Sequence, residues 1–152
     1  MYKRLILLRH GQSVWNLENR FTGWHDVELT KQGICEAIHA GKVLKYKNIL
    51  PTVVFTSVQK RALKTCYLTL DQINRLWIPH YKSYKLNERH YGALTGLNKE
   101  ETANKYGEEL VKNWRRSYKL TPPLLNKDSK YYPGNDIRYT GINNLPLGES
   151  LE

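Results

Sequence analysis

Apolar runs and helix-spaced apolar positions alternate along the first half of the chain. Residues 5–8 and 53–55 form short apolar runs that end in polar or turn residues, which is typical of buried β-strands, and the first predicted strand spans residues 2–8. Between them, Thr30 is a good helix N-cap, and we expect a helix from there to about Lys47. Its buried face is predicted from apolar or small residues at helical spacing, namely Ile34, Ala37, Ile38, Gly41 and Leu44.

The next elements continue the alternation of strands and helices. A second helix is expected to open at Ser57 or Gln59 and to end at residues 77–79, and residues 80–84 are predicted as a third, weaker strand. This order implies a parallel α/β sheet. Because parallel strands end at the same edge, the residues after each strand can meet in one pocket, which is where ligands bind in open α/β sheets.

The pattern changes after residue 85. Residues 88–96 are rich in Gly, His and Tyr and are predicted to form a loop, and residues 99–117 indicate two short helices split near Gly107. Residues 119–144 are polar, contain several Pro and Gly residues and indicate an excursion without a core of its own. The length of 152 residues suits one domain, and we assign residues 1–152 to it.

Charge and composition narrow the classes of partner. The chain is 40% hydrophobic with a formal charge of +10, which favours anionic partners such as phosphorylated metabolites, nucleic acid or acidic membranes. The basic residues are scattered, so nucleic acid binding rests on charge alone, and we expect neither a nucleic acid nor a membrane partner. Two cysteines do not make a disulfide framework, which fits a reducing, cytoplasmic setting.

Arg9, His10 and Gly11 follow the first predicted strand, and the side chains of Arg9 and His10 could bind a ligand or take part in catalysis. Histidine can act as a nucleophile, a base or a metal ligand, and a neighbouring arginine supplies a planar fork suited to phosphate. Arg61 falls in the first turn of the second predicted helix, where free backbone N–H groups favour an anion. Glu88 follows the third strand and could be a general acid, although a glutamate before an arginine is usually a surface ion pair.

Together with this motif, six segments carry a resemblance over essentially the whole chain, from residue 2 to residue 152. They are Asn16 and residues 21–24 (FTGW), 56–62 (TSVQKRA), 86–92 (LNERHYG), 94–99 (LTGLNK) and 114–117 (WRRS). In this order and spacing, the chain resembles the cofactor-dependent phosphoglycerate mutases of the histidine phosphatase superfamily.

The resemblance implies a fold and a set of roles. It implies a three-layer α/β/α phosphoglycerate mutase-like sheet, with His10 as the nucleophile that becomes phosphohistidine. It further implies that Arg9 and Arg61 hold the transferring phosphoryl group and that Glu88 is the general acid and base. The implied substrate contacts are Asn16, Thr22, Gly23, Arg89, Tyr91, Lys99, Arg115 and Arg116.

The implied reaction is the interconversion of 3-phosphoglycerate and 2-phosphoglycerate in glycolysis. The resemblance implies 2,3-bisphosphoglycerate as the priming phosphate donor, no metal, small phosphorylated three-carbon acids as partners, and a possible homo-oligomer. Family members continue past residue 152 with a second catalytic histidine and a strand inside the sheet. We therefore expect a C-terminally truncated chain with an incomplete sheet. Alternatives are an inactive fragment, an anion-binding remnant, or a bisphosphoglycerate synthase or phosphatase.

Overall fold

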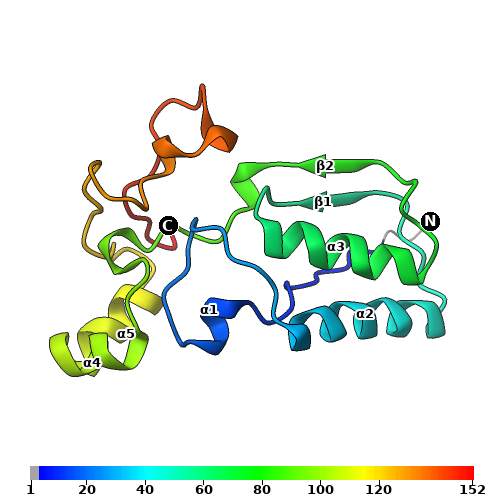
Figure 1. Cartoon of the computed structure of the whole chain (residues 1–152), viewed down its shortest axis with the longest axis horizontal. Helices are drawn as coiled ribbons and strands as arrows, with labels where there is room; N and C mark the ends of the chain where they lie inside the picture. The colour runs from blue at the N-terminus through cyan, green and yellow to red at the C-terminus, as the bar shows by residue number, and fades with distance from the viewer. Residues whose placement is uncertain (1–3) are drawn as a thin grey trace.

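A computed structural model describes residues 4–152, and its first half is built around two packed helices beside a small sheet (Figure 1). Helix α2 spans Lys31–Tyr46 and helix α3 spans Lys60–Gln72. Strands β1 (Val54–Thr56) and β2 (His80–Lys82) pair in parallel, with Val54 opposite His80. The β1–α3–β2 order confirms the predicted α/β class and the parallel direction of the second and third strands.

The contact between α2 and α3 depends on small residues. Thr30 caps α2 as predicted, because its Oγ1 accepts a hydrogen bond from the Gly33 N–H at 3.0 Å. A Cβ at Gly41 would lie 2.5 Å from the Thr69 carbonyl oxygen, so glycine is needed there for α3 to approach. The Thr69 hydroxyl donates to the Ala37 carbonyl oxygen at 3.0 Å. The buried face of α2 therefore consists of the small residues Gly33, Ala37 and Gly41. Ile34, which was predicted to lie on this face, is exposed.

Residues 14–21 and the second half of the chain pack around a separate core. Helix α1 is short (Val14–Leu17), and helices α4 (Lys99–Tyr106) and α5 (Glu108–Arg116) meet at Gly107, whose φ is +92°. This confirms the predicted split at Gly107, since a positive φ ends one helix without steric strain only at glycine. The core here consists of Phe21, Leu94, Val111 and Trp114, while Leu70, Ile73 and Ile78 form the other cluster.

The predicted polar excursion contains two 3₁₀ turns, Pro133–Asn135 and Ile137–Tyr139. Its buried residues pack against other parts of the molecule. Tyr139 is 2% exposed and packs against Trp24, with ring centroids 4.7 Å apart. Its hydroxyl accepts a hydrogen bond from the Asn87 Nδ2 at 2.9 Å, and Arg138 pairs with Asp26. The segment therefore stabilises two loops, one that contains Trp24 and Asp26 and one that contains Asn87.

The prediction of a buried first strand was wrong for the residues that the structure describes. Residues 2 and 3 lie outside this part, and residues 4–8 form no strand, with Leu5 82% and Leu7 86% exposed. An apolar run becomes a buried strand only when a neighbouring strand supplies hydrogen bonds and cover. No described residue between 4 and 152 pairs with this segment, so the sheet is incomplete, as expected.

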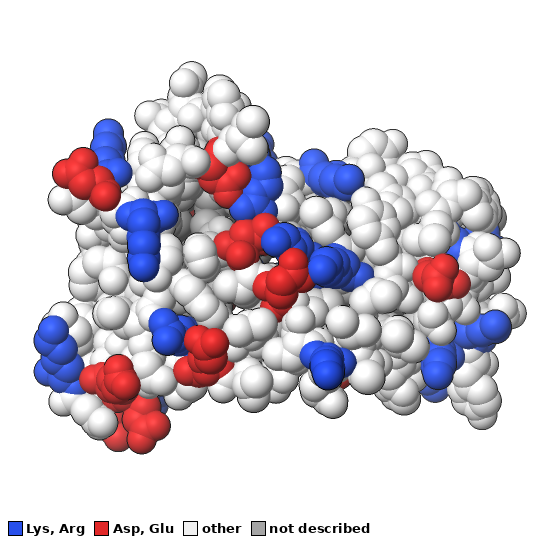
Figure 2. Space-filling view, viewed as in Figure 1, with Lys and Arg blue, Asp and Glu red and all other residues white. Residues whose placement is uncertain are grey.

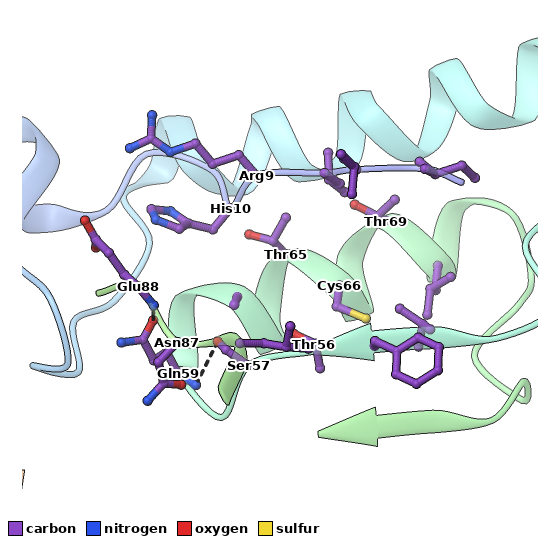
Figure 3. Close-up of a pocket in the computed structure, with 18 of the residues that line it drawn as sticks. Arg9, His10, Thr56, Ser57, Gln59, Thr65, Cys66, Thr69, Asn87 and Glu88 are labelled. Carbon is purple, nitrogen blue, oxygen red and sulfur yellow. Dashed lines mark hydrogen bonds between the residues drawn. The ribbon is translucent and has the colours of Figure 1, made fainter. Parts of the chain in front are cut away.

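A wide groove follows from this arrangement. It has a volume of about 1760 Å³ and runs between residues 4–10 and β1, with Thr65, Cys66 and Thr69 of α3 along its floor (Figure 3). One end of the groove reaches His10 and Glu88. The fold therefore opens a single continuous cavity from an apolar channel to the polar residues that follow the strands.

The surface carries charges of both signs. On the face drawn in Figure 2, Lys and Arg side chains alternate with Asp and Glu side chains and form no continuous basic surface. Among the helices of residues 4–152, none has both the length and the apolar character needed to cross a membrane. The net positive charge is thus not concentrated on this face.

Candidate active site

His10 lies at the mouth of the cavity, where the extended N-terminal segment turns. Its Nδ1 is 2.7 Å from the Gly11 carbonyl oxygen, so Nδ1 carries the donated proton and Nε2 keeps its lone pair. Burial lowers the pKa of His10, and the positive charges of Arg61 and Arg9 lower it further against the opposing effect of the Gly11 carbonyl. A neutral ring with an unprotonated Nε2 is the form that can act as a nucleophile.

The turn that holds His10 is fixed to both helices. The Gly11 N–H donates to Thr65 Oγ1 at 3.1 Å, and the Thr65 hydroxyl donates in turn to the Arg61 carbonyl oxygen at 2.8 Å. On the other side, a Cβ at Gly11 would lie 2.2 Å from the Gly33 carbonyl oxygen. The close packing of glycine on glycine therefore places the turn against α2 while Thr65 ties it to α3.

Arg61 is the most deeply buried charged residue of the site, with 0% exposure. Its Nε lies 3.3 Å from His10 Nε2, and its Nη2 donates to Glu88 Oε2 at 3.0 Å. The carbonyl oxygens of Gly23 and His25 accept from Nη2 at 2.9 Å and from Nη1 at 3.1 Å. Burial lowers the pKa of Arg61 while Glu88 opposes the change, and a guanidinium remains charged at neutral pH. The result is a fixed cation beside His10.

Glu88 comes from the loop after β2 and completes the group. Its side chain is 33% exposed, and its carboxylate and His10 Nε2 both contact the Arg61 guanidinium. Arg9 lines the same cavity. The four residues predicted as catalytic therefore converge, although they come from the N-terminal segment, α3 and the loop after β2.

Most of the predicted substrate contacts line this cavity as well. They are Asn16, Thr22, Tyr91, Lys99, Arg115 and Arg116. Neighbouring residues on a helix point about 100° apart, yet both Arg115 and Arg116 reach the cavity because it lies over the end of α5. Burial lowers the pKa of Lys99, and the charge of Arg115 lowers it further. Cations crowded in this way favour an anionic ligand between them.

Two predicted contacts lie behind the cavity wall. Gly23 has a φ of +56°, and its carbonyl oxygen accepts from Gln59 and Arg61. Arg89 donates to the carbonyl oxygens of Glu149 at 3.2 Å and Trp114 at 2.5 Å, and its guanidinium lies 4.8 Å from the Tyr91 ring centroid. Both residues shape the wall, and their direct contact with a ligand stays a prediction.

Sequence reasoning did not assign a role to Gln59 or Thr65, which line the same cavity and hydrogen-bond to the residues predicted as catalytic or to their neighbours. Gln59 is 2% exposed and Thr65 is 3% exposed, although polar residues on a helix usually face solvent. Their only sequence signal is position, because Gln59 precedes α3 and Thr65 lies one turn after Arg61. Within residues 4–152, no three His, Cys, Asp or Glu side chains gather as a metal site would require.

His90 holds the shape of the loop that carries Glu88. It is 1% exposed, and its Nδ1 accepts a hydrogen bond from the Gly92 N–H at 2.9 Å. The backbone N–H of His90 donates to Glu149 Oε2. Burial lowers the pKa of His90 to about 4. A protonated ring could no longer accept the Gly92 bond, so the loop depends on the neutral form.

The stability of the fold is expected to fall in acid because of His90. The unfolded chain protonates this histidine near pH 6.5 and the folded chain near the lowered pKa, so stability is lost as the pH falls between these values. The loss from pH 7 to pH 4 is about 3 kcal/mol. Urea unfolding of the wild type and His90→Gln at both pH values should show a smaller decrease for the variant, which does not titrate.

His39 provides the matched control, because it is an exposed histidine on α2. His39→Gln should lose as much stability in acid as the wild type does. Equal losses in His90→Gln and the wild type would contradict the prediction, since the carboxylates that also titrate in this range are common to all three proteins.

Comparison with known proteins identifies a family. Residues 5–129 match the histidine phosphatase superfamily (branch 1). Over 148 residues, the chain is 57% identical to a 2,3-bisphosphoglycerate-dependent phosphoglycerate mutase of Erythrobacter litoralis (strain HTCC2594). This match covers 97% of the chain and 64% of the relative, so the chain spans less than two thirds of that protein's length.

Solved structures share the fold. Bacillus stearothermophilus YhfR has a TM-score of 0.60 at 30% identity, with 70% of this chain and 50% of that chain covered. The phosphoglycerate mutase of Bacillus anthracis str. Sterne has a TM-score of 0.61 at 24% identity, with coverage of 70% and 48%. These similarities confirm the expected phosphoglycerate mutase-like α/β fold for this part of the domain.

Proposed function

The chain belongs to the histidine phosphatase superfamily, and from this premise we propose that it is a 2,3-bisphosphoglycerate-dependent phosphoglycerate mutase. It interconverts 3-phosphoglycerate and 2-phosphoglycerate in glycolysis, through a phosphohistidine at His10. The observation that carries the proposal is the grouping of His10 Nε2, Arg61 and Glu88 at the end of a cation-lined cavity. The name of the 57% identical relative supports the choice of substrate.

His10 is the nucleophile in this proposal. Its Nδ1–H bond to Gly11 fixes the tautomer, and its lowered pKa keeps Nε2 unprotonated at neutral pH. When Nε2 attacks the phosphorus atom of a substrate phosphate, the bond to the substrate oxygen breaks and the phosphoryl group moves to Nε2. The Arg61 N–H that now faces Nε2 would then lie beside the phosphoryl oxygens.

Arg61 and Arg9 stabilise the phosphoryl group in transit. Phosphoryl transfer spreads negative charge over three oxygens, and catalysis depends mainly on position and electrostatic stabilisation. Arg61 is held by carbonyl oxygens on one side and by Glu88 on another, so its fork needs little reorganisation. Arg9 lines the open side of the cavity and supplies a second cation.

Glu88 transfers the proton. A substrate oxygen that loses its phosphoryl group leaves as an alkoxide unless an acid protonates it, and the reverse step needs a base for the same hydroxyl. Glu88 and His10 line the same cavity and both contact Arg61, so a substrate phosphate bound at His10 would have its bridging oxygen near the carboxyl group.

The remaining cations fit the far ends of the ligands. Phosphoglycerate carries a carboxylate and a phosphate, and 2,3-bisphosphoglycerate carries a further phosphate. Lys99, Arg115 and Arg116 offer cations at the α5 end of the cavity, while Asn16, Thr22 and Tyr91 offer polar groups. When bound there, 2,3-bisphosphoglycerate supplies the phosphoryl group that primes the enzyme. These residues suit both ligands. Because both are metabolites of glycolysis, we further propose that the enzyme acts in the cytoplasm.

A second function has one observation in its favour. The cavity of about 1760 Å³ is wide and open to solvent along residues 4–10. Water that reaches a phosphorylated His10 would release inorganic phosphate, which is the reaction of a phosphatase. Mutase activity instead requires that the intermediate be kept from water while the ligand reorients.

The test is ³¹P NMR of the 152-residue chain with 3-phosphoglycerate, with and without 2,3-bisphosphoglycerate. The mutase proposal expects 2-phosphoglycerate to form in the presence of 2,3-bisphosphoglycerate, with little free phosphate. Free phosphate as the main product would support the phosphatase instead. A spectrum that matches that of a protein-free blank would overturn both functions for this chain.

A further inference from the structure

The side chain of Gln59 lines the cavity and connects two loops of the site. It is 2% exposed, and both ends of its amide are engaged. Nε2 donates to the Gly23 carbonyl oxygen at 2.7 Å, and Oε1 accepts from the Glu88 N–H at 3.3 Å. Figure 3 shows Gln59 next to Ser57 and Asn87, below the Glu88 side chain. One buried amide thus joins the turn at Gly23 to the backbone of Glu88.

These two bonds belong to a closed ring of contacts with Arg61. The Gly23 carbonyl oxygen that accepts from Gln59 also accepts from Arg61 Nη2 at 2.9 Å. The same Nη2 meets the Glu88 carboxylate at 3.0 Å. Gln59 therefore holds the Glu88 backbone while Arg61 holds its side chain, and the two residues are close in sequence at the start of α3.

The chemistry of this position requires a glutamine-like side chain. One partner is an acceptor and the other is a donor, so the side chain must offer both kinds of group. Leucine would leave a buried N–H and a buried carbonyl oxygen each without one partner, which is costly. Asparagine offers both groups but is one methylene shorter and cannot span the same two partners.

We propose that Gln59 is a positioning residue that sets the place of Glu88 for proton transfer. The inference rests on the proposed function, in which Glu88 protonates the leaving oxygen. Gln59 touches neither the nucleophile nor that carboxylate through its amide, so its effect passes through the Glu88 backbone. Small displacements of a general acid reduce the rate strongly, because the transfer of a proton needs hydrogen-bond distance.

The leaving group separates a positioning role from a general loss of structure. Transfer from 2,3-bisphosphoglycerate to His10 expels an alkoxide, which needs a proton from Glu88. Transfer from p-nitrophenyl phosphate expels a stabilised phenolate, which leaves without one. A variant that only misplaces Glu88 therefore slows the first transfer much more than the second, as Glu88→Gln should also do.

The experiment measures His10 phosphorylation from both donors in single turnovers. Gln59→Leu is expected to slow transfer from 2,3-bisphosphoglycerate by about 10-fold or more and transfer from p-nitrophenyl phosphate by less than about 3-fold. Gln59→Asn keeps a polar side chain and should show the same ratio if the leucine variant fails to fold. Gln32→Leu, at an exposed position on α2, is the control and should leave both rates unchanged.

Each outcome has a defined meaning. Equal slowing with both donors, or no slowing, overturns the positioning role while the wild-type activity leaves the proposed function intact. If the wild type transfers phosphate from neither donor, the proposed function fails and this inference fails with it.

Discussion

Replacing Arg61 with methionine is expected to slow phosphoryl transfer to His10 by about 10³-fold or more, which is the effect of removing a transition-state arginine from other phosphoryl-transfer enzymes. Three observations support an effect of this size. Arg61 is fully buried, its Nε lies 3.3 Å from His10 Nε2, and its Nη2 contacts Glu88. Methionine keeps much of the volume but removes the charge and every donor.

Arg61→Lys tests whether the fork matters beyond its charge. An ammonium group is a point charge and cannot reproduce the simultaneous contacts to His10, Glu88 and two carbonyl oxygens. We therefore expect this variant to remain well below the wild type, at a rate between that of the wild type and that of Arg61→Met. The measurement is the single-turnover rate of His10 phosphorylation from 2,3-bisphosphoglycerate, with a thermal melt of each protein alongside.

Lys64→Met is the matched control, because Lys64 lies on the same helix but is exposed and pairs with Glu28. This variant should keep the wild-type rate. A normal rate in Arg61→Met, or full activity in Arg61→Lys, would show that Arg61 is a structural cation and would remove it from the proposed mechanism.

Local signals explain which elements could be predicted. Thr30 gives a cap and Gly107 gives a break, and both act through neighbouring residues, so α2 and the split between α4 and α5 were found. The first strand was predicted but does not form in residues 4–8, because burial of Leu5 and Leu7 needs a partner strand, which is a property of the whole sheet. The same apolar pattern therefore gives an exposed segment when no described residue pairs with it.

The site divides in the same way. The roles of His10, Arg61 and Glu88 could be proposed because the resemblance implies them, and the predicted parallel sheet indicated that such residues could meet at one edge. The structure brings the three side chains together. Roles for Gln59 and Thr65 could not be proposed, since their burial depends on how α3 packs against loops far away in sequence. Sequence patterns thus indicate residues with a proposed role in the reaction more readily than residues that position them through hydrogen bonds.

His10→Ala is expected to abolish the covalent intermediate and to reduce turnover by at least about 10⁴-fold, as loss of a nucleophile does elsewhere. We expect no other residue to accept the phosphoryl group in its place. The His10 ring is oriented by the Gly11 carbonyl oxygen, has a lowered pKa and contacts Arg61. The measurement is ³²P labelling of the chain from 2,3-bisphosphoglycerate, followed by acid treatment, which removes phosphate from histidine but not from serine or threonine.

The exposed His39 on α2 is again the matched control, and His39→Ala should take up as much acid-labile label as the wild type. The pH dependence gives a second check with a definite sign. Because the pKa of His10 is lowered, the neutral nucleophile persists below pH 6.5, where an ordinary histidine would become protonated, and labelling should decline only in more acidic buffer. Persistent label in His10→Ala would place the nucleophile elsewhere, and the geometry of Arg61 and Glu88 would then require another explanation.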